Sequence, residues 1–180
     1  MTKKDFALSY LKNGISVFPT HGKKPLVAWE KYSKEKPTEQ EVIDWWTKWP
    51  DADIAGSTGV VSGLVVIDVD GGEVPKLTPT AISETSPGHY QYFFKHPGFP
   101  IQNSAKVIAS NVDVRGDGGF VVLPPSRHFN KETGKQDFTY KWSLPPKEAG
   151  FTDLPQELLE KVKTKKSFDS ENIEQEDVDE

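Results

Sequence analysis

Residues 63–70 read GLVVIDVD, and this stretch is the most informative part of the sequence because it joins a predicted buried strand to two carboxylates. Its apolar, largely β-branched residues favour a strand inside a sheet. Side chains alternate between the faces of a strand, so Asp68 and Asp70 share one face and Val69 lies on the other. Two like charges on one face repel each other unless a cation lies between them, and oxygen ligands suit a divalent metal ion. The stretch therefore indicates a metal site, or else two solvent-facing aspartates before a Gly71-Gly72 turn.

The composition is that of a globular domain whose negative charge is unevenly distributed. The 180 residues carry a formal net charge of −5 and enough hydrophobic side chains for one packed core. Residues 167–180 include seven acidic residues and no basic one, which leaves 22 basic and 20 acidic residues elsewhere. We expect this tail to be a flexible, solvated end or a hook for a partner. The net charge therefore does not argue against a polyanionic partner of the remaining chain.

The absence of cysteine narrows the chemistry that the chain can perform. It excludes disulfides, cysteine-ligated zinc and thiol nucleophiles. No stretch resembles a signal peptide or a membrane span. The expected location is therefore the cytoplasm, with no membrane among the partners.

Local patterns predict two helices followed by a block of strands, which is typical of the α+β class. Thr2 and Thr38 each precede a helical pattern and have an acidic residue three positions later, as in a capping box. The glycines at 116–119 predict a hairpin or a bulged turn between two strands. A last helix is expected over 154–163, with Asp153 as its cap. Strands are expected at 15–19, 54–57, 64–70, 89–94, 112–115, 120–123 and 138–143, and a loop at 23–25.

A second group of candidate residues lies in NVDVRGDGG, residues 111–119. Asp113 and Arg115 share one face of a short predicted strand. If that strand lies beside residues 64–70, Asp113 adds a third carboxylate to the first two. Arg115 then offers a fixed cation to a phosphate or to an acidic neighbour. The alternative is a structural Asp113–Arg115 pair in a hairpin.

Single polar and aromatic residues carry weaker signals. His89 follows a Pro-Gly turn at the start of a predicted strand, where a histidine can contact a phosphate or a base, or be structural. Lys23 and Lys24 lie in a predicted loop and taken alone indicate only solvated side chains. Four of the five tryptophans are interpreted as core residues rather than as base-stacking platforms, namely Trp29, Trp45, Trp46 and Trp49.

Taken together, these motifs resemble the bifunctional DNA primase/polymerase (Prim-Pol) domain of plasmid and phage replication proteins, within the archaeo-eukaryotic primase superfamily. The resemblance rests first on the order of Asp68-Val69-Asp70, Gly88-His89, VDVRG at 112–116 and VVLPPS at 121–126. The opening NGISVFP at 13–19 and the closing Tyr140-Lys141-Trp142 extend it over residues 5–145.

The resemblance implies an RRM-like catalytic β-sheet part packed with a small N-terminal α/β part. Residues 1–150 would be the catalytic domain, 151–166 a C-terminal helix and 167–180 the acidic tail. By residue match, the metal ligands are Asp68, Asp70 and Asp113. His89 contacts the phosphates of the incoming nucleotide, and Arg115 supports either Asp113 or the triphosphate.

The implied activity is template-dependent nucleotidyl transfer by a DNA primase and/or DNA polymerase of a plasmid, phage or prophage. Two Mg²⁺ or Mn²⁺ ions are the implied cofactors. The implied partners are a single-stranded DNA template with its primer, nucleoside triphosphates and a replicative helicase. Two other functions stay open at this point, namely a non-catalytic single-stranded DNA-binding replication module and a metal-dependent phosphoesterase.

Overall fold

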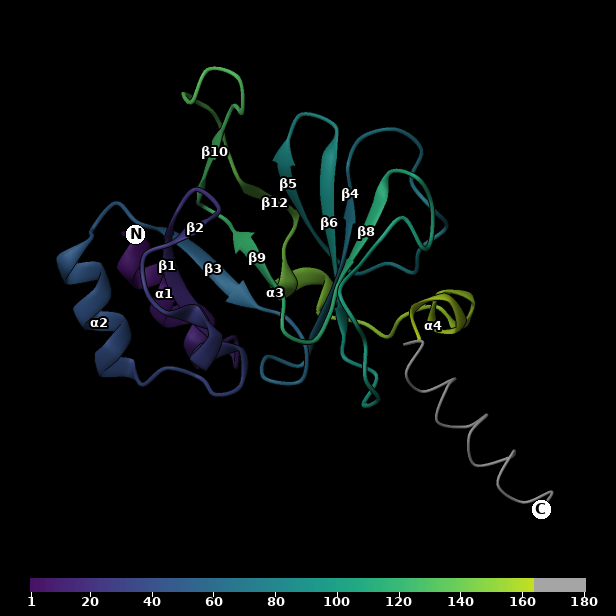
Figure 1. The fold of residues 1–180 in the computed structure, drawn as a ribbon, viewed down its shortest axis with the longest axis horizontal. Coiled ribbons are helices and arrows are strands. Elements are labelled where there is room, and N and C mark those ends of the chain that lie inside the picture. Colours follow the sequence, from purple (N-terminus) through teal and green to yellow (C-terminus); the bar gives the residue numbers. More distant parts are fainter. Residues whose placement is uncertain (164–180) are drawn as a thin grey trace, which may run out of the picture.

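The computed structural model describes residues 1–163, which form two antiparallel sheets, a short hairpin and several helices (Figure 1). This arrangement confirms the predicted α+β class. The predicted acidic tail at 167–180 and residues 164–166 of the predicted last helix lie outside the described residues. The helices are α1 (Lys3–Lys12), α2 (Glu39–Lys48), α3 (Pro146–Ala149) and α4 (Gln156–Val162), and η1 (Trp29–Ser33) is a 3-10 helix.

The smaller sheet has the strand order β2-β1-β3-β9, and all its neighbouring strands are antiparallel. Its fourth strand comes from late in the chain, so this part is not built from the N-terminal segment alone. The two-residue β2 also replaces part of the loop predicted at 23–25. The bounds are β1 (Val17–His21), β2 (Lys24–Pro25), β3 (Asp53–Ser57) and β9 (Phe120–Leu123).

The larger sheet has the strand order β12-β5-β6-β4-β8-β7 and is antiparallel throughout. The strand that contains Asp68 lies inside it, between β6 and β8. The bounds are β4 (Leu64–Val69), β5 (Ala81–Ser86), β6 (His89–Lys95), β7 (Ser104–Ala105), β8 (Val112–Arg115) and β12 (Lys141–Leu144). A separate hairpin consists of β10 (Arg127–Phe129) and β11 (Gln136–Thr139).

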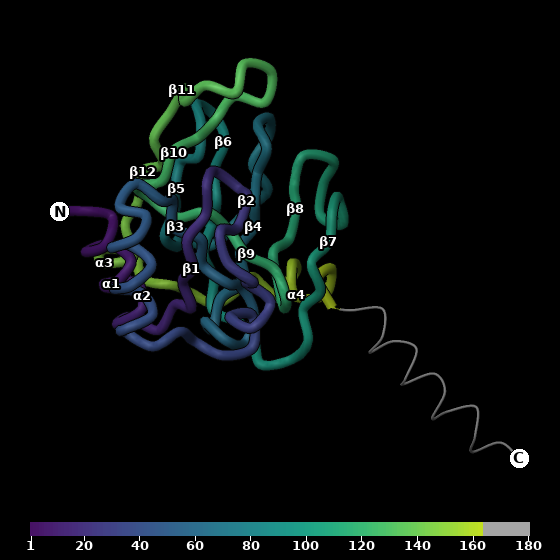
Figure 2. Tube along the Cα trace, turned by 60° about the vertical axis from the view of Figure 1, so that its left-hand side comes forward, coloured from purple at the N-terminus to yellow at the C-terminus, as the bar shows by residue number. Residues whose placement is uncertain are grey.

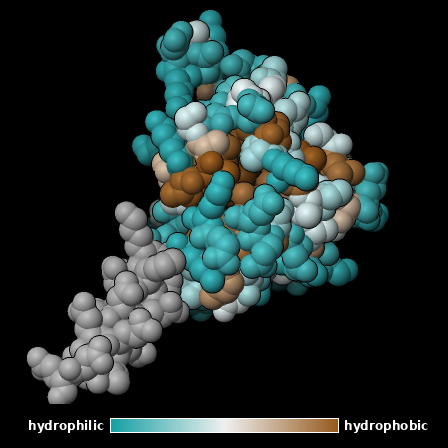
Figure 3. Space-filling view, turned by 90° about the vertical axis from the view of Figure 1, so that its right-hand side faces the viewer, coloured by the Kyte–Doolittle hydropathy of each residue, from teal (hydrophilic) through white to brown (hydrophobic). Residues whose placement is uncertain are grey.

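The two faces of β4 pack into different cores because its side chains alternate. Leu64 and Val66 belong to a core that also contains Ala7 of α1 and Trp46 of α2. Val65, Ile67 and Val69 of β4 point to the opposite face and pack with Leu158 of α4. The helix α4 therefore lies on the opposite side of the molecule from α1 and α2 (Figure 2). Half-buried apolar side chains border this second core, and Figure 3 shows apolar surface on the side of α4.

The predicted helix starts are confirmed by their hydrogen bonds. Thr2 and Asp5 cap α1 reciprocally, and Thr38 and Glu41 do the same for α2. A capping box satisfies backbone N–H groups that have no partner within the first turn of a helix. The last helix differs from the prediction, because its first residue follows Pro155 and Asp153 does not cap it.

The predicted hairpin between residues 112–115 and 120–123 is wrong. The first strand, β8, pairs with β4, whereas the second, β9, pairs with β3 in the other sheet. The glycine segment between them therefore carries the chain from one sheet to the other. It passes so close to Ile101 that a Cβ on Gly116 would lie 2.3 Å from the Ile101 carbonyl oxygen.

The predicted strand at 138–143 is also wrong, because it is divided at Tyr140. Residues before this tyrosine pair with β10, and residues after it pair with β5. The strand β5 itself was not predicted, since its buried positions include small polar side chains. Ser83, for example, is buried and donates a hydrogen bond of 3.1 Å to Gln91 Oε1. Such pairing removes the cost of burying a hydroxyl group.

Candidate functional site

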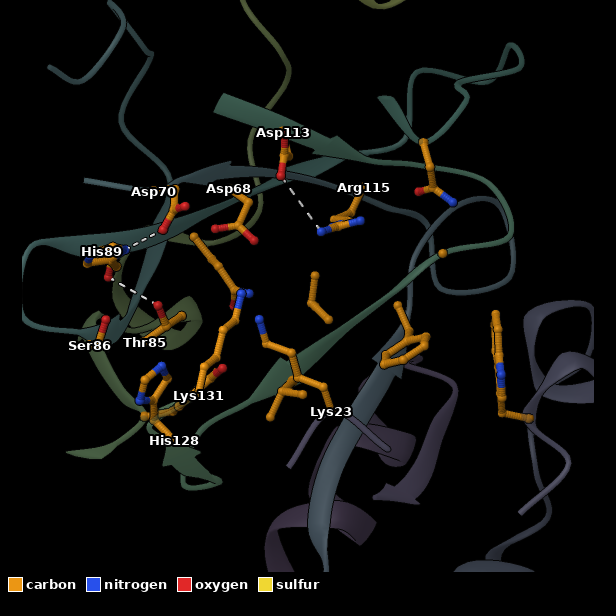
Figure 4. Close-up of a pocket in the computed structure, with 18 of the residues that line it drawn as sticks. Lys23, Asp68, Asp70, Thr85, Ser86, His89, Asp113, Arg115, His128 and Lys131 are labelled. Carbon is orange, nitrogen blue, oxygen red and sulfur yellow. Dashed lines mark hydrogen bonds and ion pairs between the residues drawn. The ribbon is translucent and has the colours of Figure 1, made fainter. Parts of the chain in front are cut away.

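A cavity of about 640 Å³ lies between the two sheets and the β10–β11 hairpin, and the predicted site residues line it. The larger sheet supplies one wall through β4, β6 and β8. The other wall comes from the β1–β2 turn, β9 and the hairpin. Figure 4 shows that carboxylates occupy the first wall and that two lysines reach toward them from the second.

The register of the larger sheet places Asp68 directly opposite Asp113. The two residues are paired across β4 and β8, as expected if the second strand lay beside the first. Directly opposite residues in antiparallel strands have Cβ atoms about 4.5–5.5 Å apart and lie on the same face. This face also holds Val66, which packs into the core with α1 and α2. The alternating pattern of each strand therefore directs both carboxylates into the cavity.

The half-buried position of Asp68 opposes ionisation of its carboxyl group. Burial raises the pKa of Asp68, and the neighbouring Asp113 and Asp70 raise it further. The positive charges of Arg115 and Lys23 act in the opposite direction without cancelling this effect. A carboxylate in such a place is stabilised by a bound cation, because the cation compensates both desolvation and like-charge repulsion.

Asp70 lies just beyond the end of β4, and its Oδ1 is 2.6 Å from His89 Nδ1. The turn that follows is held by Asn111, whose Nδ2 donates hydrogen bonds to the carbonyl oxygens of Gly71 and Glu73. Gly71 has a φ of +72°, which favours glycine at this position. The predicted nucleotide contact His89 is thus brought into the cavity, where it binds one of the predicted metal ligands.

Arg115 lies on the same strand face as Asp113, with Nη2 at 3.9 Å from Asp113 Oδ2. The two are half-exposed, so this ion pair contributes little to stability. Within residues 1–163 no three carboxylate or histidine side chains are arranged closely enough to hold a metal ion as they stand. The cross-strand pair Asp68–Asp113 supplies adjacent oxygen ligands, and Asp70 is engaged by His89. This oxygen donor set fits Mg²⁺ or Mn²⁺.

The opposite wall contains cationic residues that the sequence did not reveal as a group. Lys23 comes from the β1–β2 turn, and Lys131 and His128 come from the hairpin. The sequence around Lys23 indicates only a solvated lysine, and no motif singles out the hairpin residues. Isolated basic residues in turns have no spacing that distinguishes a cavity wall from an exposed loop, so no local signal was available.

Two aromatic side chains are among those that line the cavity. Phe120 and Trp29 are half-buried, and their ring centroids lie 5.0 Å apart at an angle of 65°. Trp29 also stacks on the buried Phe18, so the pair is anchored in a small core on the smaller sheet. The prediction that four tryptophans belong to the core holds for the buried Trp46 and for Trp45 and Trp49, which pack against the same core. Trp29 is instead shared between core and cavity.

The comparison with known families agrees with this geometry. The family described as "Bifunctional DNA primase/polymerase, N-terminal", or Prim-Pol, matches residues 7–157. The chain belongs to the Prim-Pol family. The match includes Asp68, Asp70, His89, Asp113 and Arg115, and it confirms the resemblance drawn from the sequence. No curated protein matches the chain.

Membership of the Prim-Pol family gives the chain a primase/polymerase type of function in replication. DNA and nucleotides are the substrates that this family implies. Among the described residues of this Prim-Pol domain, none of the helices has the length and apolar character needed to cross a membrane.

Proposed function

We propose that this Prim-Pol domain is a template-dependent nucleotidyltransferase that acts as a DNA primase and/or DNA polymerase in the replication of a plasmid, phage or prophage. The observation that carries the proposal is the cross-strand pair Asp68–Asp113 in a cavity whose opposite wall is cationic. Nucleotidyl transfer needs this combination, since oxygen ligands must hold metal ions while cations balance a triphosphate.

The metal ligands of the proposal are Asp68, Asp113 and Asp70. Two Mg²⁺ or Mn²⁺ ions, when bound there, supply the electrostatic activation of a 3′-hydroxyl group and the stabilisation of the leaving pyrophosphate. Asp68 and Asp113 are presented by neighbouring strands of one sheet, which holds their positions without any rearrangement of the backbone. Asp70 lies in the adjoining turn, where it contacts His89, and it would provide the third carboxylate.

The cationic side chains serve to bind and orient the triphosphate. His89 contacts the phosphates, and Arg115 either supports Asp113 or contacts the same phosphates. Positive groups fixed at the site of a developing negative charge stabilise the transition state. No protein nucleophile is required, which agrees with a chain that has no cysteine.

The DNA strands and a nucleobase complete the proposed site. Phe120 and Trp29 offer aromatic surface in the lining of the cavity, and stacking on an aromatic ring accommodates any base. Basic side chains near the cavity bind the phosphates of a single-stranded template and its primer. The partner that unwinds DNA for such an enzyme is a replicative helicase.

A primer-extension assay with Mg²⁺ or Mn²⁺ tests the proposal. The variants Asp68→Asn and Asp113→Asn keep the side-chain shape and remove the charge, and we expect each to lose at least 100-fold in extension rate, about 2.7 kcal/mol. Asp44→Asn, an exposed aspartate on α2, is the matched control and should keep the wild-type rate. Circular dichroism and thermal unfolding show whether the variants remain folded.

Three outcomes contradict the proposal. Wild-type extension rates in either active-site variant exclude these carboxylates from catalysis. Single-stranded DNA binding that persists with a chelator, without any nucleotide incorporation, indicates a non-catalytic replication module. Release of phosphate from nucleotides without templated incorporation indicates a metal-dependent phosphoesterase.

A further inference from the structure

The two walls of the cavity are connected by two crossings of the chain that are bonded to each other. The first crossing runs from β3 to β4 through residues 58–63, and the second runs from β8 to β9 through residues 116–119. In Figure 1 both crossings lie at the ends of the sheets away from the β10–β11 hairpin. We call these two segments the joint. Each of them links one wall to the other, so the contacts within the joint set the walls relative to each other.

Hydrogen bonds and close backbone packing hold the two crossings of the joint together. The Thr58 N–H donates to the Gly119 carbonyl oxygen at 2.9 Å, and the Thr58 hydroxyl donates to the Gly116 carbonyl oxygen at 2.6 Å. The backbones touch at Gly59, where an added Cβ would lie 2.5 Å from Asp117 Oδ1. A side chain at this position would therefore push the crossings apart.

Asp117 contributes most to the joint, because its carboxylate contacts three separate segments. Its Oδ1 accepts from the Val60 N–H in the first crossing at 3.0 Å, and its Oδ2 accepts from the Ile101 N–H at 2.8 Å. The same Oδ1 lies 3.0 Å from Nε2 of His96, directly after β6. An ionised carboxylate has enough lone pairs for all these donors. One side chain thus ties the second crossing to the first crossing and to the end of the larger sheet.

The ring of His96 depends on this carboxylate. The side chain is only 4% exposed, and its Nδ1 accepts from the Gly98 N–H at 3.1 Å, so the ring carries its proton on Nε2. Within residues 1–163 no group forms a well-directed hydrogen bond with this Nε2, and Asp117 Oδ1 is the acceptor beside it. A buried N–H group without an acceptor is costly. Removal of the Asp117 carboxylate would therefore release the end of β6 as well as the joint.

The joint bears on the reaction because cavity residues lie on both sides of it. Asp113 on β8 is paired with Asp68 in the larger sheet, whereas Phe120 begins β9 directly after the second crossing. Gly118, within the crossing, lines the cavity itself. Rotation at the joint would move Phe120 relative to the carboxylates and leave Asp68–Asp113 intact, since that pair belongs to one sheet. The competing explanation is that Asp117 only stabilises the fold.

We infer that Asp117 is a positioning residue which, together with His96, holds the two walls of the cavity at the separation that nucleotidyl transfer needs. The inference rests on the proposed function for the nature of the reaction. Asp117 does not line the cavity, so it acts through the backbone of the joint. A misplacement of reacting groups by about 1 Å can lower a rate about 100-fold. A looser joint therefore slows the reaction even in a chain that stays folded.

Distance measurements by pulsed electron paramagnetic resonance on the full chain test the joint without any need for turnover. Because the chain has no cysteine, Asp44→Cys on α2 and Glu157→Cys on α4 provide one pair of spin labels. Both positions are exposed, and α2 contacts β1 of the smaller sheet whereas α4 packs with β4 of the larger one. The test variants in this background are Asp117→Ala, Asp117→Asn and His96→Phe. His96→Gln is the conservative variant, because its amide N–H can still donate to Asp117.

Thr80→Val is the matched control for a loss of stability alone. The Thr80 hydroxyl is buried, donates to the Phe93 carbonyl oxygen and accepts from the Thr152 N–H, and it bonds to neither crossing. We expect the Asp117 variants and His96→Phe to broaden the distribution of label distances and to lower kcat for primer extension roughly 10- to 100-fold. Their affinity for Mn²⁺, measured by calorimetry, should stay at the wild-type value. His96→Gln should recover most of the rate, and Thr80→Val should change only the midpoint of thermal unfolding.

Two results overturn the inference. One is a distance distribution in Asp117→Ala and His96→Phe that equals the wild-type distribution. The other is a loss of kcat in Thr80→Val as large as that in Asp117→Ala at the same loss of thermal stability. If Asp117→Ala does not fold, His96→Phe decides by the same readouts. If the distances broaden but the wild type extends no primer, the joint stands and the proposed function fails.

Discussion

Asp68 and Asp113 lie directly opposite each other on adjacent antiparallel strands, with both side chains on the cavity face of the larger sheet. Like charges in this relationship destabilise a sheet. The larger sheet therefore carries an unfavourable pair in its interior, and a bound cation would relieve it. Pairs of side chains that lower the stability of the folded protein are expected at functional sites, where their position serves the function.

The first prediction concerns the stability of the metal-free protein. Because the pKa of Asp68 is raised, the folded state holds this proton more tightly than the unfolded chain does. The stability contributed by this group therefore falls as the pH rises from the ordinary value of 3.8 through the raised pKa. At pH 7 with a chelator, Asp68→Asn should raise the midpoint of thermal unfolding by about 2–4 °C, or about 1 kcal/mol.

Addition of Mn²⁺ should reverse the order of the two proteins. Under the proposed function, the ion would stabilise the folded wild type by binding to it, whereas the variant would lack one ligand and gain less. A chelated Asp68→Asn protein that melts below the wild type would show that this carboxylate is not in conflict with the fold.

The second prediction concerns the pair Asp70–His89. Removal of the imidazole in His89→Ala should raise the KM for the nucleotide about tenfold and change kcat less, because a phosphate contact is lost. His89→Gln should recover part of the loss. His21→Ala, which removes a histidine outside the cavity, serves as the control. An unchanged KM in His89→Ala would remove this residue from the nucleotide site.

The third prediction assigns a positioning role to Asn111. Its side chain donates hydrogen bonds of 2.5 and 2.9 Å to the backbone of the turn that follows Asp70. Asn111→Ala should lower the free energy of unfolding by about 1–2 kcal/mol. It should also raise the Mn²⁺ concentration needed for half-maximal extension, since Asp70 is no longer held in place.

Asn13→Ala is the matched control for this role. Asn13 Nδ2 donates a hydrogen bond of 2.8 Å to the Ser9 carbonyl oxygen at the end of α1, far from the cavity. Its loss should leave the Mn²⁺ dependence unchanged. Equal metal dependence of Asn111→Ala and the wild type would reduce Asn111 to a structural residue.

The fourth prediction concerns Asp53, which joins α1, β3 and β10. Its buried carboxylate contacts Lys3 and Arg127, so Asp53→Ala leaves two cations without their partner. We expect a loss of about 3–5 kcal/mol in the free energy of unfolding, measured by urea denaturation. A loss below about 1 kcal/mol would show that the site relaxes by admitting water.

The same residue should shape the acid unfolding of the protein. Burial alone would raise the pKa of Asp53, but hydrogen bonds from Arg127, Gly22 and Lys3 outweigh burial and lower it. The stabilisation is therefore present above the ordinary value of 3.8 and is lost as the pH falls from there through the lowered pKa. Asp53→Asn should flatten the pH dependence of stability in this acidic range.

Local sequence patterns predicted the parts of the site that depend on neighbouring residues. The alternation within residues 64–70 placed Asp68 and Asp70 on one face, and the same rule placed Asp113 and Arg115 on one face of the strand that is β8. The capping boxes at Thr2 and Thr38 were likewise local and are confirmed. Hydrogen bonds and strand faces within a few residues follow from the order of side chains alone.

The strand partners after the glycine segment 116–119 could not be predicted in the same way. A glycine-rich turn suits a hairpin equally well as a crossing between sheets, and local propensity does not distinguish the two. The crossing is selected by long-range packing, in which β9 pairs with β3 and Gly116 passes close to Ile101. The choice of partner strand depends on how the whole core packs, so the residues near a turn do not reveal which strands pair.

The order of residues along the chain was enough to predict the α+β class, the Prim-Pol resemblance and the shared strand faces of the carboxylates. The folded structure was needed to show that Asp113 lies opposite Asp68, that His89 contacts Asp70, and that Lys131 lines the cavity from a hairpin. The physical reason is that periodicity sets the face on which a side chain lies. Its partners across the cavity depend on how separate elements pack together.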